Sequence, residues 1–505
     1  MKRLYPIIIA IASMAMFSCS VIEEQDVIEV KNGTELVFEA TNEGDVETKT
    51  AVQSDGKSVW WNPYEKVNIF FGDSESSLFT STNSVPVAKA QFRGTIEAFT
   101  GEVDGNDDDY FWAIYPYDAS NTSDGSSVTV TLSANQTACA ETFADNQWLT
   151  VARSKGLALS FRAVCAGFRF SVTKPGIKSV TFKGNNNEIL AGKARIAMDA
   201  DNLPYVQDNI IGERVITLSA PAGETLEVGT LYYMTFFPNN FTKGFTVTFN
   251  TETETGSRVY GAKDFKRTDV HRGVDFDKDV EYVPAINGHA YVEMGNGLKW
   301  ATMNLGAYDT TEPGDYFAWG ETEPYYDSKI PFHWKDGKSE GYAWGSYQFN
   351  PSGDGITFTK YNSESSVTLQ NTDDAARLNW GGTWRMPTYK ELDALWNGDD
   401  YTWEWTDDYN GSGMAGEIVT SKVPGYVGNS IFLPAAGGCG KSFYNVGFSG
   451  FYWSSSLSIT SSISVEVDAS CAFGLVFEYY DYGDNYINGS EYQRVTGQCI
   501  RPVSN

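Results

Sequence analysis

The sequence predicts a mainly β protein that ends in an α+β domain. Between about residues 27 and 283, short runs of alternating apolar and polar residues are separated by turn-forming residues, a pattern typical of strands. After about residue 284 the composition becomes rich in Trp and Gly, and one segment near residue 390 has helical spacing. The 505 residues are too many for one hydrophobic core, which indicates roughly two to four domains.

The charge of the chain argues against one class of partner. It has 37 basic and 65 acidic residues, so the formal net charge is −28. A surface this negative repels phosphate backbones, and we therefore expect no nucleic-acid partner. Calcium, cationic surfaces and neutral glycans are all compatible with this charge.

The first 18 residues have the features of a signal peptide. Two basic residues, Lys2 and Arg3, precede an apolar run from Leu4 to Phe17. A run of about 14 apolar residues is too short to cross a hydrocarbon layer of about 30 Å. It ends in Ser18-Cys19, which resembles the lipobox of bacterial lipoproteins and implies that Cys19 carries lipid. The alternative is cleavage by ordinary signal peptidase, which would leave Cys19 unmodified.

Residues 19–32 are expected to form a lipid-tethered linker. In this interpretation the lipid is the only contact with the membrane. Glu23, Glu24 and Asp26 follow the lipidation site closely, as in related lipoproteins that reach the outer face. The predicted location is the outer membrane, with the protein on the cell surface or in a fimbrium.

The other five cysteines are too few and too scattered for a disulfide-dense scaffold. Cys471 and Cys499 flank a turn-rich stretch, so they either face each other across a hairpin or remain thiols. The chain has three histidines and no C-x-x-C pair, which argues against a structural zinc site. The five cysteines are Cys139, Cys165, Cys439, Cys471 and Cys499.

The strand-rich part carries a family resemblance. Three blocks, TKTAVQSDGKSVWWNPYEKVNIFFG, FWAIYPY and LSFRAVCAGFRFSV, resemble the fimbrillin-like lipoproteins of Bacteroidales. The last block slips by one residue at Ala166-Gly167, which predicts a β-bulge. The resemblance implies two transthyretin-like β-sandwiches, at residues 33–174 and 175–283, with a joint near Thr173–Ser179. It also implies assembly with other fimbrial subunits by strand donation.

The last part of the chain resembles a second family. The ordered blocks DYFAWGETEP, TDDAARLNWGGTWRMPTYKELDALW, SIFLPAAGG, GFYWSSS and CIRPV are similar to the Fibrobacter succinogenes major paralogous domain. This resemblance covers about residues 287–505 and implies an α+β domain with the C-type lectin-like fold at residues 284–505. Formylglycine-generating enzymes share that fold, but the close cysteine pair of their site is absent from this sequence.

The segment WGGTWRMPTYKELDALW predicts a structural helix. Thr388 and Glu391 are three residues apart, as in a capping box, and Leu392, Leu395 and Trp396 have the spacing of one buried face. Glu391 is therefore interpreted as a cap and not as a general base. Just upstream, Asp374 favours the start of an earlier helix, and Arg385 is expected to pair with an acid such as Asp374.

No motif in the sequence supports catalysis. G-x-S-x-G, H-E-x-x-H and P-loop patterns are all absent. Glu321 and Glu323 form a pair of acids, but such pairs are common in so acidic a chain and are weak support for a glycosidase. The chain is therefore predicted not to be an enzyme.

The best candidate for ligand binding is the Tyr-rich segment EYYDYGDNYINGSEY. Aromatic rings beside Asp and Asn supply flat faces for sugar C–H groups and acceptors for hydroxyl groups. The alternative is a hairpin tip without a ligand. The candidate residues are Tyr479, Tyr480, Asp481, Tyr482, Asp484, Asn485 and Tyr486.

A metal site has weaker support, and no cofactor is required. The loop from Thr406 to Glu417 contains Asp408 and Asn410 at suitable spacing for calcium, but it lacks the bidentate acid at the twelfth position of an EF-hand. A solvated loop is the simpler interpretation. Further binding candidates are Trp319–Glu323 and Asp407–Asn410.

Together these expectations describe a cell-surface adhesin. A lipid lies at one end, sandwich domains follow, and a lectin-like head binds a host or bacterial surface glycan or protein. Such a chain would serve as a fimbrial (pilus) tip or accessory subunit. The alternative is a stand-alone surface glycan-binding lipoprotein for nutrient capture, and an enzyme on the lectin-like fold is the third possibility.

Overall fold

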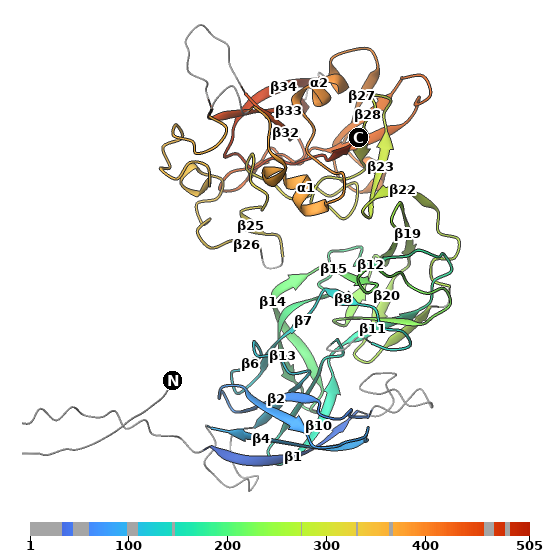
Figure 1. The fold of residues 1–505 in the computed structure, drawn as a ribbon, viewed down its shortest axis with the longest axis vertical. Coiled ribbons are helices and arrows are strands. Elements are labelled where there is room, and N and C mark those ends of the chain that lie inside the picture. Colours follow the sequence, from blue (N-terminus) through green and yellow to red (C-terminus); the bar gives the residue numbers. More distant parts are fainter. Residues whose placement is uncertain are drawn as a thin grey trace, which may run out of the picture.

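A computed structural model places the chain in three units that follow one another along the longest axis (Figure 1). It describes residues 33–43, 60–97, 110–143, 147–273, 275–329, 332–362, 367–458, 469–479 and 485–505. The predicted signal peptide, Cys19 and the linker to residue 32 lie outside these ranges. Within them, no helix is both long and apolar enough to cross a membrane.

The barrel unit is a ring of strands in the order β1-β10-β9-β5-β2-β3-β4. The ring closes because β4 pairs with β1 from Thr34 to Thr41, so the layers expected of the first sandwich are joined at their edges. The strands are β1 (Thr34–Asn42), β2 (Lys66–Phe71), β3 (Ser77–Ser81), β4 (Lys89–Ile96), β5 (Phe111–Tyr115), β9 (Thr150–Ser154) and β10 (Ala158–Ala163).

Strand β5 contributes to two hydrophobic cores. Its sequence FWAIY is apolar at consecutive positions, as expected of a strand buried on both faces. Phe111 and Ala113 pack inside the barrel, whereas Trp112 and Ile114 pack into the core of the next unit. The barrel unit and the middle unit therefore share an apolar contact.

The middle unit combines three small sheets with part of a large one. Strands β7 and β8 precede residue 174 but pair with β13 and β15, so the sheets cross the expected boundary at 174/175. The small sheets are β14 (Pro204–Glu213), β13 (Ala191–Met198), β7 (Val128–Leu132) and β6 (Thr122–Ser123); β16 (Tyr232–Phe236), β11 (Ala166–Phe170) and β21 (Val270–Gly273); and β17 (Asn239–Phe241) with β20 (Lys263–Phe265).

The period slip at Ala166-Gly167 has a different cause from the expected bulge. The chain leaves the barrel at the end of β10 and enters another sheet at the start of β11. A Cβ atom on Gly167 would lie 2.6 Å from the carbonyl oxygen of Met234, so glycine permits the close approach of β16. The slip marks a change of sheet.

A nine-stranded sheet continues from the middle unit into the C-terminal unit. Strand β19 of the middle unit pairs with β22 of the C-terminal unit from Glu254 to Gly256. The order is β35 (Val503–Ser504), β24 (Lys299–Ala301), β23 (His289–Glu293), β22 (Tyr282–Ile286), β19 (Glu254–Tyr260), β18 (Phe245–Asn250), β12 (Ser179–Gly184), β15 (Val215–Ser219) and β8 (Asn135–Thr137).

The C-terminal unit is also mostly strands, with two short α-helices among its described residues. The mainly β prediction is confirmed for the molecule as a whole. The helices are α1 (Ala375–Trp380) and α2 (Tyr389–Trp396). The strands are β25 (Tyr326–Asp327) with β26 (His333–Trp334); β27 (Tyr401–Thr406), β28 (Gly416–Ser421) and β29 (Ser430–Pro434); β30 (Gly438–Cys439) with β31 (Phe443–Tyr444); and β32 (Ser449–Leu457), β33 (Cys471–Tyr479) and β34 (Asn485–Gln493). Short 3₁₀ turns occupy Trp344–Ser346, Asn371–Asp373 and Tyr409–Gly411.

The predicted capping box of α2 is confirmed. Thr388 Oγ1 accepts from the Glu391 N–H at 3.3 Å, and Glu391 Oε2 accepts from the Thr388 N–H at 2.7 Å. The expected Arg385–Asp374 pair does not form. Arg385 binds both carboxylate oxygens of Glu391, at 2.8 and 2.6 Å, while Asp374 caps α1 and accepts from the Met386 N–H.

Of the two alternatives for Cys471 and Cys499, the structure has thiols and no bridge between them. Cys471 lies opposite Gln493 in the β33–β34 ladder. Cys499 is a buried free thiol that donates to the Pro313 carbonyl at 3.4 Å. In this register Cys471 faces Gln493, so the two cysteines do not lie opposite each other across the hairpin.

Candidate functional site

The Tyr-rich segment lies at the end of the β33–β34 hairpin. Tyr479 is the last residue of β33, Asn485 is the first residue of β34, and Tyr486 follows it. Tyr486 is 46% exposed, and its hydroxyl accepts from Asn488 Nδ2 at 2.9 Å. The remaining candidates, Tyr480, Asp481, Tyr482 and Asp484, lie outside the described residues.

The base of this hairpin carries an aromatic stack. The rings of Tyr479 and Trp405 are nearly parallel, with centroids 4.8 Å apart and an interplanar angle of 7°. Trp405 Nε1 also donates to Asp407 Oδ1 at 2.8 Å. Two predicted candidate segments, the hairpin and the loop at Asp407–Asn410, are therefore adjacent in space. Tyr486 lies opposite Glu478 in the ladder, so its side chain is on the other face of the sheet from Tyr479. We call Trp405, Asp407 and Tyr479 the head cluster.

In the loop next to the head cluster, a candidate metal ligand is engaged with the backbone. Asp408 Oδ1 accepts from the Gly413 N–H at 2.6 Å, and Asn410 has a left-handed backbone with φ of 53°. Among the described residues, no group of three or more His, Cys, Asp or Glu side chains is arranged to hold a metal ion. Calcium binding by Asp408 and Asn410 stays a prediction.

A buried carboxylic acid lies beside the head cluster, and it is absent from the sequence-based candidates. Glu417 faces Trp405 across the β27–β28 ladder and is 1% exposed. Its Oε2 atom has no hydrogen-bond partner. Burial, followed by the charge of Glu404, raises the pKa of Glu417 to about 7. The alternation of Glu417, Val419 and Ser421, all buried, is the signal that places this acid on the inner face.

The acids of the WGETEP block have structural roles. Glu321 is 6% exposed and accepts from the Tyr325 hydroxyl at 2.9 Å and the Gln348 N–H at 2.7 Å. Burial raises its pKa. Glu323 instead forms an exposed ion pair with Lys335 at 3.1 Å. The two acids are engaged separately and do not form a catalytic pair.

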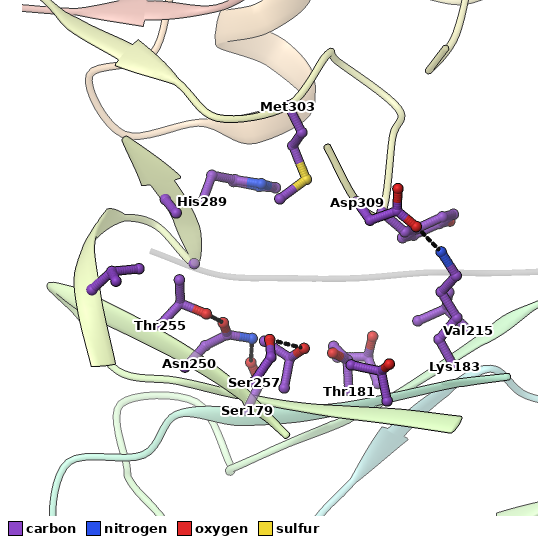
Figure 2. Close-up of a pocket in the computed structure, with 18 of the residues that line it drawn as sticks. Ser179, Thr181, Lys183, Val215, Asn250, Thr255, Ser257, His289, Met303 and Asp309 are labelled. Carbon is purple, nitrogen blue, oxygen red and sulfur yellow. Dashed lines mark hydrogen bonds and ion pairs between the residues drawn. The ribbon is translucent and has the colours of Figure 1, made fainter. Parts of the chain in front are cut away.

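A second site, which sequence reasoning missed, lies between the middle and C-terminal units. It is a cleft of about 630 Å³ between the outward face of β15-β12-β18-β19 and the segment from Asn287 to Asp309. Figure 2 shows Ser179, Thr181 and Ser257 on one side of this inter-unit cleft and His289 and Met303 on the other. The alternation of polar and apolar residues in β12 and β18 predicts a polar face, but only the fold shows what covers it.

Ion pairs hold the two walls of the inter-unit cleft together. Lys183 of β12 binds Asp309 at 2.8 Å and Glu312 at 2.5 Å. Lys329 of the C-terminal unit binds Glu213 of β14 at 2.6 Å. These contacts join residues more than a hundred positions apart and fix the cleft between two folded units.

No protein-family model and no curated protein sequence matches the chain. Three solved structures are similar to it at low identity. A candidate cell adhesion protein from Bacteroides ovatus is 11% identical, with 50% of this chain and 96% of that chain covered and a TM-score of 0.32. One from Bacteroides uniformis is 16% identical, with 50% and 96% covered and a TM-score of 0.31.

The third similar structure is the C-terminally truncated tip fimbrial protein Mfa3 from Porphyromonas gingivalis. It is 10% identical, with 50% of this chain and 98% of that chain covered and a TM-score of 0.26. TM-scores below 0.5 do not establish a common fold. The functional conclusions therefore depend on the sequence and on the contacts of this chain.

Proposed function

We propose that the protein is a cell-surface adhesin, a fimbrial tip or accessory subunit whose C-terminal unit binds a glycan or protein receptor. The lipobox at Cys19, the fimbrillin-like blocks and the major-paralogous blocks support this order of tether, spacer and head. The boundaries 33–174, 175–283 and 284–505, the transthyretin-like and C-type lectin-like folds and strand donation to other subunits belong to the same proposal.

The observation that carries the proposal is the parallel stack of Tyr479 on Trp405 beside Asp407. Stacking fixes the orientation of both rings before a ligand arrives, which lowers the entropy lost on binding. The outer ring surface suits the C–H face of a pyranose, and Asp407 supplies hydrogen-bond acceptors at its edge.

The test is a glycan array with the full chain, with and without calcium. A weak ligand with a Kd of about 1 mM to about 1 μM is expected, which corresponds to about −4 to −8 kcal/mol. Tyr482→Ala and Tyr486→Ala should each weaken binding by about two- to tenfold without changing the melting temperature. Tyr205→Ala is the matched control, because Tyr205 is 48% exposed on β14 of the middle unit.

Several outcomes would redirect the proposal. If both substitutions leave glycan or cell binding intact, the site lies away from the hairpin tip, at Trp319–Glu323 or at Asp407–Asn410. If no glycan binds under either calcium condition, a protein receptor becomes the better ligand class. Ladders of pilus subunits on a denaturing gel would support the fimbrial role, and their absence from cells that display the protein would favour a stand-alone glycan-capture lipoprotein.

A further inference from the structure

The floor of the inter-unit cleft is a regular array of short polar side chains. One row across the sheet reads Thr217, Thr181, Thr248 and Ser257, because these residues are partners in adjacent ladders. Adjacent strands lie about 4.8 Å apart, so the hydroxyl groups are evenly spaced on a flat surface. Long side chains, which usually cover an exposed sheet face, are absent from this row.

Part of this array is free to bind a ligand. Thr248 and Ser257 share a hydrogen bond at 2.7 Å, and Thr255 donates to Asn250 Oδ1 at 2.6 Å (Figure 2). In contrast, the hydroxyl groups of Thr181 and Thr217 have no hydrogen-bond partner in the described part of the chain. Each can therefore donate one hydrogen bond and accept others from a molecule in the cleft.

The roof of the cleft carries an apolar patch beside the polar side chains of Asn287, Tyr308 and Asp309. It includes Met303, Ala290 and Ala307, and the imidazole of His289. His289 stacks on Trp380, with ring centroids 3.7 Å apart and an angle of 7°. Burial lowers the pKa of His289 to about 4, so its ring is uncharged at neutral pH.

The two lysines at the cleft are compensated by acids of the protein, and an exposed acid, Glu281, also lines it. Lys183 is bound by Asp309 and Glu312, and Lys178 forms an ion pair with Glu252. An anionic ligand such as a phosphate would compete with these carboxylates for the two cations. The cleft therefore suits an uncharged molecule.

We propose that the inter-unit cleft is a second binding site, independent of the head cluster, for a neutral oligosaccharide. A pyranose ring has hydroxyl groups at its edges and C–H groups on its faces, which match the hydroxyl floor and the apolar patch of the roof. The volume of about 630 Å³ lies in the usual range for small-ligand sites, which often form between domains. The hairpin with the head cluster lies at the far end of the C-terminal unit (Figure 1), so the two sites can be tested separately.

The experiment is calorimetric titration of the full chain with four neutral probes, maltotriose, cellotriose, lactose and diacetylchitobiose, and with glucose 6-phosphate as an anionic probe. At least one neutral probe should bind. The double variant Thr181→Val/Thr217→Val should raise its Kd by about fourfold to a hundredfold, because each substitution removes one hydroxyl. Both substitutions keep a β-branched side chain and break no hydrogen bond of the protein, so the melting temperature of the double variant should stay the same.

Two controls separate this site from the head cluster. Thr181→Ser/Thr217→Ser retains both hydroxyls and should restore binding, and Thr95→Val, on an exposed position of β4, should have no effect. Tyr479→Ala, which removes the stacked ring of the head cluster, should leave neutral-probe binding at the cleft unchanged. The proposal is overturned if no neutral probe binds, if glucose 6-phosphate binds as tightly, or if binding is lost in Tyr479→Ala and retained in the double valine variant. The last result would favour the head cluster alone.

Discussion

Glu417 is a carboxylic acid in an environment that disfavours its charge. Its side chain is almost fully buried opposite Trp405, and one carboxylate oxygen has no partner. Because the pKa is raised to about 7, the folded state holds this proton over a range where the unfolded chain releases it. The stabilisation is fully present below about pH 4.5 and is lost as the pH rises through about 7.

The first prediction is that Glu417→Gln weakens the pH dependence of stability. Between pH 5 and pH 8, the free energy of unfolding of the native chain should fall by roughly 1–3 kcal/mol more than that of the variant. Urea denaturation at both pH values measures this difference. Glu404→Gln should produce a smaller change in the same direction, since the Glu404 charge is the second cause of the shift. If the free energy of unfolding changed equally with pH in the native chain and in both variants, the raised pKa of Glu417 would be contradicted.

The second prediction concerns Cys19, which lies outside the described residues. Cys19→Ala should abolish labelling by a fatty-acid probe and release the protein from membranes, because Cys19 is expected to carry the only lipid. Fractionation and metabolic labelling of cells measure both effects. Unchanged labelling would remove the lipoprotein interpretation.

At the residue scale, sequence patterns identified functional candidates only where the residue types are unusual. The tyrosines of the hairpin and Asp407 are conspicuous, and the structure places Tyr479 on the ring face of Trp405 and Asp407 at its ring N–H. Trp405 and Glu417 were not predicted, because their importance depends on which residue lies opposite in the ladder. Register between strands is a tertiary property that one strand does not encode.

Helix α2 shows how an element combines local and tertiary interactions. Its capping box depends on residues three positions apart, and it was therefore predictable. The ion pair between Arg385 and Glu391 was not predictable. The Glu391 carboxylate accepts hydrogen bonds both from Arg385 and from the Thr388 N–H of the cap. Similarly, the slip at Ala166-Gly167 was visible in the sequence, but a bulge and a change of sheet produce the same pattern.

The third prediction tests α2. Thr388→Ala should destabilise the C-terminal unit by about 1 kcal/mol, the usual cost of a lost N-cap. From the sequence alone, Glu391→Gln is expected to leave the stability of the C-terminal unit nearly unchanged, because a Gln side chain can also accept from the cap N–H. The structure predicts instead a loss of roughly 1 kcal/mol, because the half-buried charge pair with Arg385 disappears. Thermal unfolding of both variants measures these costs, and a silent Glu391→Gln would show that Arg385 contributes nothing.

At the scale of the whole molecule, Lys183 couples the middle unit to the C-terminal unit. Its ammonium group lies between Asp309 and Glu312, and the side chain is only 17% exposed. No sequence pattern indicates this contact, because its partners are separated from Lys183 by more than a hundred residues. The inter-unit cleft was unpredictable for the same reason.

The fourth prediction is that Lys183→Met loosens the arrangement of the two units. Their thermal transitions should separate, and the maximum dimension in small-angle scattering should increase, because two carboxylates lose their shared cation. Lys178→Met is the control, since Lys178 pairs with Glu252 inside the middle unit on an exposed surface. High salt should weaken the effect only in part, because the Lys183 pairs are partly buried. Identical behaviour of the two variants would contradict the coupling.

In the proposed adhesive role the chain would carry tension between two surfaces, and the nine-stranded sheet joins the middle unit to the C-terminal unit along that line. Strands β19 and β22 join over three residue pairs, and Pro284 of β22 has no N–H to donate. By comparison, β12 and β18 join over six pairs inside the middle unit. A force that pulls the middle unit from the C-terminal unit should therefore open the β19–β22 ladder before β12 and β18 separate. The molecule would lengthen and absorb load while the hydrophobic cores on either side remain folded.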